Sequence, residues 1–161
     1  MRRLPALVAL VALVALGVLP LSACSGDAPA SGFCGASDTV ASFGGMSANF
    51  PGTRVLADAE AGDMTALHEW GASGGEAFGD RVAALERARD AAPTDEVAHA
   101  IDDLLAVVGP MASIYAAASE APDLESFLDA LDAIPAPDAA DDDAANAAVA
   151  LIEQAESETC D

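Results

Sequence analysis

The sequence predicts an all-α fold, a small up-and-down bundle of about five or six helices. Large apolar residues recur at intervals of three and four along the second half of the chain, which is the spacing of a buried helix face. Alanine, the best helix former, is abundant throughout. No segment shows a convincing alternation of apolar and polar residues, so strands are not expected. Helices joined by short turns pack as antiparallel neighbours, which gives a bundle.

Three helical segments are expected in the first part of the domain. They cover about 36–49, about 54–70, and a stretch that restarts near Phe78 and ends before Pro93. The first has Val40, Phe43 and Met46 on helical spacing. Gly71, Gly74, Gly75 and Gly79 lie between the second and the third, and a run of glycines predicts a break in the helix.

The clearest helix begins after Thr94, a good N-cap residue that is followed by two acids. Pro110 removes one backbone donor and predicts a kink, beyond which the helix continues to about Glu120. The residues expected on its inner face are Val97, Ile101, Leu104, Leu105 and Val108.

Two more helices are expected before the C-terminus. Asp123 is the expected N-cap of the first, and the second covers about 141–159. The apolar residues assigned to their inner faces are Leu124, Phe127, Leu128, Leu131 and Ile134, then Val149, Leu151 and Ile152.

The N-terminus has the pattern of an export signal. Met1-Arg2-Arg3 is basic, and the segment from Leu4 to Gly26 is uncharged and rich in Leu, Val and Ala. An uncleaved membrane anchor is the alternative, because about 20 apolar residues can span a bilayer. Pro20 and the small residues before Cys24 favour cleavage instead.

Residues Leu21, Ser22, Ala23 and Cys24 resemble the lipobox of bacterial lipoproteins. The resemblance implies that the Cys24 thiol receives a diacylglyceryl group and that Cys24 becomes the first residue of the mature protein. The expected division is a signal peptide over 1–23, a lipidated flexible tether over 24–32 and an acidic helical domain over 33–161. The expected location is the extracytoplasmic face of the cell membrane, where acyl chains hold the protein.

The mature chain is strongly acidic and poor in large apolar residues. It contains 4 Arg, no Lys, and 27 Asp and Glu residues in total. Such a charge repels phosphate groups, so no binding of nucleic acid is expected. Leu, Ile, Val and Phe together make up only 25 mature residues, and disorder is therefore the alternative to a folded domain with a thin core.

Two cysteines remain after Cys24, one near each end of the mature domain. In an exported protein Cys34 and Cys160 predict a disulfide. A metal or redox role is the alternative, but the chain has no Cys-x-x-Cys motif. The mature part is similar to small alanine-rich, lysine-poor helical lipoproteins of high-GC actinobacteria, which have a cysteine near each end and mostly no assigned function.

Two motifs with possible metal chemistry are weak. Glu96 and His99 have the i, i+3 spacing of metal ligands in helical bundles, and Asp103 follows one turn later. His99 lies opposite the Leu104 stripe, however, so a solvated polar face is the simpler interpretation. Met64 and His68, one turn apart, could hold a soft metal but are more often ordinary packing. We predict no metal site and no cofactor.

One motif suggests catalysis. The segment 71–75 matches G-x-S-x-G, which places a nucleophilic serine on a turn between a strand and a helix. The residues before Ser73 are helical in pattern, and only His99 follows as a base. No catalytic residue is therefore predicted.

Two hypotheses of function remain. The first is a non-enzymatic lipoprotein that binds another envelope protein or a wall component through a helix face. The alternative is a carrier of a small apolar ligand or a metal ion between its helices, with a cavity flanked by Trp70, Tyr115 or Met111.

Overall fold

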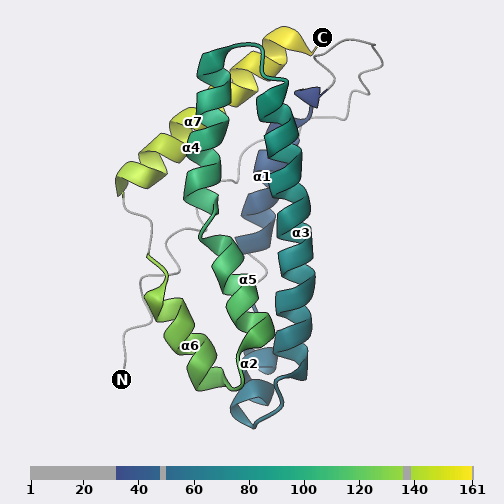
Figure 1. Ribbon diagram of the computed structural model, residues 1–161, viewed down its shortest axis with the longest axis vertical. Coiled ribbons are helices and arrows are strands. Elements are labelled where there is room, and N and C mark those ends of the chain that lie inside the picture. Colours follow the sequence, from purple (N-terminus) through teal and green to yellow (C-terminus); the bar gives the residue numbers. More distant parts are fainter. Residues whose placement is uncertain (1–31, 48–49, 136–138, 161) are drawn as a thin grey trace.

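The computed structural model describes residues 32–47, 50–135 and 139–160, and within these ranges every regular element is a helix (Figure 1). The predicted all-α bundle is confirmed. The helices are α1 (Ala36–Ser47), α2 (Thr53–Glu60), α3 (Thr65–Asp90), α4 (Asp95–Val108), α5 (Met111–Glu120), α6 (Leu124–Ala133) and α7 (Ala139–Thr159). The expected signal peptide, Cys24 and most of the expected tether lie outside the described residues.

The number of helices depends on how the junction of α4 and α5 is counted. The two helices follow one another along α3 and meet at Gly109-Pro110 (Figure 1). Counted together they form one helix, Asp95–Glu120, which gives six in the described chain. Pro110 cannot donate a backbone hydrogen bond, and the predicted kink with continuation to Glu120 is confirmed.

Helix α3 runs the length of the molecule and carries two hydrophobic cores (Figure 1). The disulfide-side core joins α1, the C-terminal half of α3, α4 and α7, and also includes Tyr115 of α5. The far core joins α2, the N-terminal part of α3, α5 and α6. Fully buried side chains occur in both, with Leu85, Ile101 and Ile152 in the first and Leu67 and Phe127 in the second.

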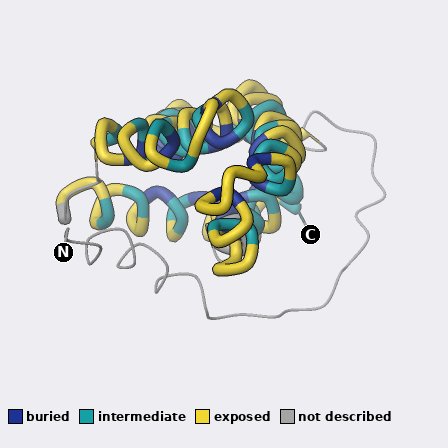
Figure 2. The backbone as a smooth tube through the Cα atoms, turned by 90° about the horizontal axis from the view of Figure 1, so that it is seen from below, coloured by how far each residue is buried: buried dark blue, intermediate teal, exposed yellow. Residues whose placement is uncertain are grey.

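Trp70 of α3 packs against both cores and connects them. Figure 2 shows that buried residues gather where the helices face one another and that exposed residues cover the outside. The structure thus shows a thin but continuous interior, built in large part from alanine: Ala36, Ala88, Ala100, Ala118 and Ala148 are all buried.

Both predicted N-caps are present. The Thr94 hydroxyl accepts a hydrogen bond from the backbone N–H of Val97 at 3.3 Å, and the Asp123 carboxylate accepts one from Ser126 at 2.8 Å. Each cap satisfies a donor that the first turn of a helix otherwise leaves free. The α4 inner face is also confirmed, with Leu105 half-buried beside its more fully enclosed neighbours.

The single helix expected over 54–70 is wrong. Helix α2 ends at Glu60 and α3 begins at Thr65. Gly62 between them has a φ of +95°, a left-handed conformation that ends a helix readily at glycine. The Asp63 carboxylate then accepts the backbone N–H of Thr65, the first residue of the next helix, at 3.0 Å.

The break expected at the glycine run is also wrong, because α3 is continuous from Thr65 to Asp90. Gly71 and Gly74 lie where α3 meets α5. A Cβ on Gly71 would come within 2.5 Å of the Ser119 backbone nitrogen, and one on Gly74 would lie 2.3 Å from the Tyr115 ring. These glycines permit a close contact between helices, and that packing outweighs their poor helix propensity.

The inner faces of the last two helices need smaller corrections. Leu128, assigned to the α6 core, is 43% exposed, while Phe127 and Leu131 are buried. In α7 only Ile152 of the expected residues is fully buried, and Val149 and Leu151 are half-buried. The side chain of Met46 lies outside the described part of α1.

Candidate functional site

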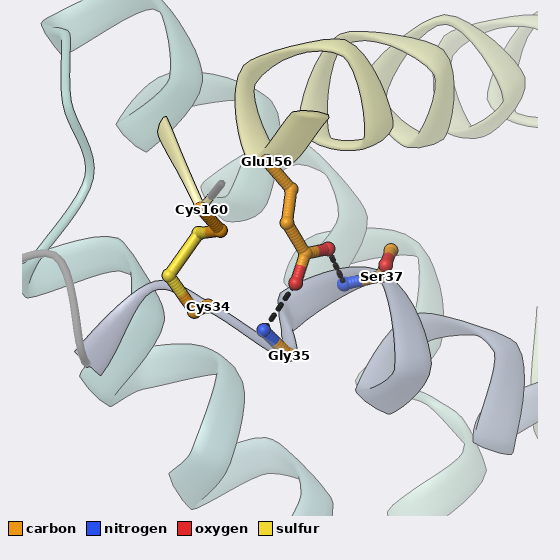
Figure 3. Close-up of a disulfide and its surroundings, with 5 residues drawn as sticks. All are labelled: Cys34, Gly35, Ser37, Glu156 and Cys160. Carbon is orange, nitrogen blue, oxygen red and sulfur yellow. Dashed lines mark hydrogen bonds between the residues drawn. A yellow bond between two sulfur atoms is a disulfide. The ribbon is translucent and has the colours of Figure 1, made fainter. Parts of the chain in front are cut away.

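One end of the bundle is closed by a disulfide, beside which a carboxylate joins the same two helices (Figure 3). Cys34 lies two residues before the start of α1 and Cys160 follows α7, and their sulfurs are 2.03 Å apart at a sequence separation of 126. The predicted Cys34–Cys160 disulfide is confirmed. It ties the first described helix to the last, within the disulfide-side core.

Glu156 lies beside this disulfide and joins the same two helices. Its carboxylate accepts the backbone N–H of Gly35 through Oε1 and that of Ser37 through Oε2, the latter at 3.0 Å (Figure 3). A carboxylate at a helix N-terminus satisfies free donors and is favoured by the helix dipole. Gly35 has a φ of +96°, which turns the chain from Cys34 into α1.

Sequence reasoning missed Glu156. The available signal was its position four residues before Cys160, which places the two side chains on one face of a helix. Cys160 also donates its backbone N–H to the Glu156 carbonyl at 2.9 Å, so the last turn carries the helical geometry as far as the cysteine.

An open groove lies between α1 and α3, with a volume of about 420 Å³. Arg81 crosses it, donating from Nε to the Ser42 hydroxyl at 2.8 Å and from Nη1 to the Ala77 carbonyl at 2.7 Å. The residues that line the groove are Asp38, Thr39, Ser42, Ala77, Asp80, Arg81 and Ala84.

Three polar side chains of this groove, those of Thr39, Ser42 and Arg81, are engaged in hydrogen bonds. The hydroxyls of Thr39 and Ser42 donate to the carbonyls of Gly35 and Thr39. The lining does not include Trp70, Tyr115 or Met111, the residues expected beside a ligand cavity. The groove is therefore a polar depression, and the hydrogen bond from Arg81 to Ser42 across it joins α3 to α1.

Trp70 and Tyr115 lie together in a row of aromatic side chains. The Tyr115 ring centroid is 5.0 Å from that of Trp70 and 6.0 Å from that of Phe78, and Phe50 flanks Trp70 at 6.0 Å. Tyr115 is buried and covers Gly74. Burial raises the pKa of Tyr115 above its usual 10.0, and the positive charge of Arg81 partly opposes this.

The metal candidates are not gathered into a site. Glu96, His99 and Asp103 are exposed on α4, as the helical spacing indicated for His99. Across residues 32–47, 50–135 and 139–160 no group of three or more His, Cys, Asp or Glu could hold a metal ion.

The other motifs also have structural explanations. Met64 is buried in the far core, and the His68 Nε2 atom is hydrogen-bonded to the carbonyl of Ala121 at 2.9 Å. Ser73 lies within α3, where its hydroxyl donates to the carbonyl of Glu69 at 2.8 Å. G-x-S-x-G is therefore part of a continuous helix here, without the strand and turn that expose a nucleophile.

Comparison with known proteins gives no further guide to the site. No protein-family model matches the chain, and neither the curated proteins nor the solved structures include a significant match. What is established is a disulfide-closed helical bundle, and its function is inferred from its own residues.

Proposed function

We propose that this protein is a lipid-anchored lipoprotein on the extracytoplasmic face of the cell membrane, with a non-enzymatic helical domain that binds another envelope protein or a wall component. The observation that carries the proposal is the Cys34–Cys160 disulfide, which favours an oxidising compartment. It agrees with the export signal and the lipobox that precede the domain in the sequence.

The anchor would hold the disulfide-closed end of the domain near the membrane. Segment 24–32 can extend to at most about 30 Å. Gly32 lies against the end of α3, where a Cβ would come within 3.0 Å of the Ala91 Cβ atom. Helix α2 and the turn before α6 would then point away from the bilayer, toward the wall (Figure 1).

A binding role is favoured over catalysis by the surroundings of the candidate groups. Ser73 bonds to its own helix, and His99 lies exposed on α4. His68 is hydrogen-bonded to a backbone carbonyl, that of Ala121, and Cys34 and Cys160 are joined in the disulfide. The chain is rich in Asp and Glu, and the exposed faces of its helices can contact basic or hydrogen-bonding partners.

The apolar stretch Asp95–Glu120 does not require a second membrane attachment. Its length and composition would allow it to cross a bilayer. Ile101, Leu104 and Ala118 on its inner side are buried in the bundle, which is the pattern of an amphipathic helix with one face packed on its neighbours.

The anchor is tested by comparing the wild-type chain with Cys24→Ser in its own envelope. We expect the wild type to partition with membranes, to begin at residue 24 and to carry the mass of acyl chains, and the variant to lack that mass. A wild-type protein that retains residues 1–23, or that has a free Cys24 thiol, would refute the lipoprotein assignment.

The binding role is tested by native mass spectrometry of the protein extracted from that envelope, under gentle and denaturing conditions. Loss of a protein partner or a wall fragment would support the binding module. Loss of a small apolar molecule or a metal ion would instead indicate the carrier. No lost mass, together with no crosslinked partner in intact envelopes, would overturn both.

A further inference from the structure

We propose that Glu156 positions Cys34 and Cys160 for disulfide formation, by holding the start of α1 against the end of α7 before the thiols are oxidised. The carboxylate joins the same two segments as the disulfide. It lies on α7 one turn before Cys160, and its partners Gly35 and Ser37 follow Cys34 closely (Figure 3). The inference does not depend on the lipid anchor or on a binding partner.

The apolar packing around this end brings the helices together. Phe33 and Ile152 are fully buried, and Ala36 and Ala155 are nearly so, all within the disulfide-side core. Apolar contacts are not directional, whereas two backbone N–H groups that meet two carboxylate oxygens fix one relative position of the helices. Glu156 thereby sets the register that brings Cys34 opposite Cys160.

The distance along the chain makes this positioning important. Closing a loop of 126 residues carries a substantial entropic penalty in a chain that is free to open. A contact that keeps the two ends together in the reduced protein raises the effective concentration of one thiol near the other.

The reaction can be written with oxidised glutathione as the oxidant. The thiolate of one cysteine attacks a glutathione sulfur, forming a mixed disulfide and releasing one glutathione thiol. The thiolate of the second cysteine then attacks the protein sulfur of this mixed disulfide, which forms Cys34–Cys160 and releases the second glutathione. The protein loses two protons and two electrons, and glutathione disulfide takes them up. Glu156 acts on the second, intramolecular step.

The test measures the equilibrium of this exchange in the full chain, purified in detergent as the Cys24→Ser variant, so that Cys34 and Cys160 are the only cysteines. The protein is equilibrated with mixtures of reduced and oxidised glutathione, alkylated and weighed. In Glu156→Gln one carboxylate oxygen and the charge are lost. We expect the equilibrium constant for disulfide formation to fall about tenfold, and the intramolecular step to slow.

Glu158→Gln is the matched control, because Glu158 is an exposed acid on the same turn that accepts from Gln154 of its own helix. We expect its equilibrium constant to stay within about twofold of the parent. Glu156→Asp keeps the charge on a side chain that is one methylene shorter, which should weaken its contact with the two N–H groups. Its equilibrium constant for disulfide formation should lie between those of the parent and Glu156→Gln. If Glu156→Gln does not fold, the comparison of Glu156→Asp with the parent is the test of the proposal.

Two results would overturn the proposal. One is that the equilibrium constants for disulfide formation in Glu156→Gln and Glu156→Asp are the same as in Glu158→Gln. The other is a loss of unfolding free energy that is equal in the oxidised and reduced forms, because Glu156 would then only cap α1 and would not favour oxidation.

Discussion

Tyr115 is a residue whose acid–base chemistry the fold alters through burial. It is the only tyrosine in the chain and is buried between Trp70 and Phe78, over the open face of Gly74. Burial disfavours the tyrosinate anion and raises the pKa of Tyr115. The raised pKa means that the folded state prefers the neutral phenol.

This preference predicts a loss of stability at alkaline pH. A raised folded-state pKa gives a stabilisation that is complete below the unfolded value near 10.0 and lost as pH rises through the folded value. We expect the tyrosinate ultraviolet absorbance to appear at higher pH in the native protein than in denaturant. Arg81→Gln should move the native midpoint higher still, because the cation that favours tyrosinate is gone. Equal midpoints in the native and denatured protein would contradict the prediction.

Other residues differ in how readily the sequence reveals them. Cys34 and Cys160 could be paired from composition alone, since they are the only cysteines left after the expected lipidation of Cys24. Glu156 was harder to select: its position four residues before Cys160 was a signal, but the chain contains 27 acids and many lie in similar alanine-rich helices. What sets it apart is its contact with Gly35 and Ser37, and that contact exists only once α7 lies beside α1.

At the scale of the helices, the glycines of α3 decide how closely α3 and α5 pack. Gly71 faces the backbone of α5, whereas a Cβ on Gly79 of the same helix would meet no atom of a neighbouring element within 4 Å. Both residues are glycines within one helix and differ in their surroundings. Alanine substitutions at the two positions therefore separate the effect of helix packing from that of helix propensity.

Substitution of each by alanine should change stability in opposite directions. We expect Gly71→Ala to lower the free energy of unfolding by about 1 to 3 kcal/mol, because α5 must shift to admit the methyl group. Gly79→Ala should raise it by up to about 1 kcal/mol, because alanine is the better helix former. Urea denaturation followed by circular dichroism measures both. A stabilised Gly71→Ala protein would show that α3 and α5 are not in close contact.

These elements show where prediction from sequence succeeds. The caps Thr94 and Asp123 were predictable because each acts on a backbone group three residues away. The kink at Pro110 was predictable because it follows from the chemistry of one residue. The continuity of α3 was not, because the advantage of Gly71 and Gly74 comes from Tyr115 and Ser119, which lie more than 40 positions along the chain.

At the scale of the whole molecule, helix α3 contributes to two small cores. Within the described chain, one disulfide cross-links the two ends of the domain. The disulfide closes a loop that contains nearly the whole domain, so it restricts the unfolded chain strongly. A chain with so few large apolar residues and so much negative charge depends on this restriction more than a larger domain would.

Removal of the disulfide should therefore be a severe change. The loop-entropy relation gives a loss of at most about 5 kcal/mol for Cys34→Ser combined with Cys160→Ser. We expect a large drop in the urea midpoint, and the same drop for the wild type in a reducing buffer. If the oxidised and reduced proteins unfold at the same urea concentration, the two cores are sufficient without the cross-link.

The position of the disulfide also determines how the domain responds to mechanical force. Tension applied between the segment before Cys34 and the segment after Cys160 passes through the sulfur–sulfur bond, so the helices between them carry almost none of it. Tension applied elsewhere, for example at the turn between α2 and α3, must pass through the packed helices and would pull α3 away from its neighbours. The domain is thus mechanically shielded at its ends, and a load from its distal turns is the one that would unfold it.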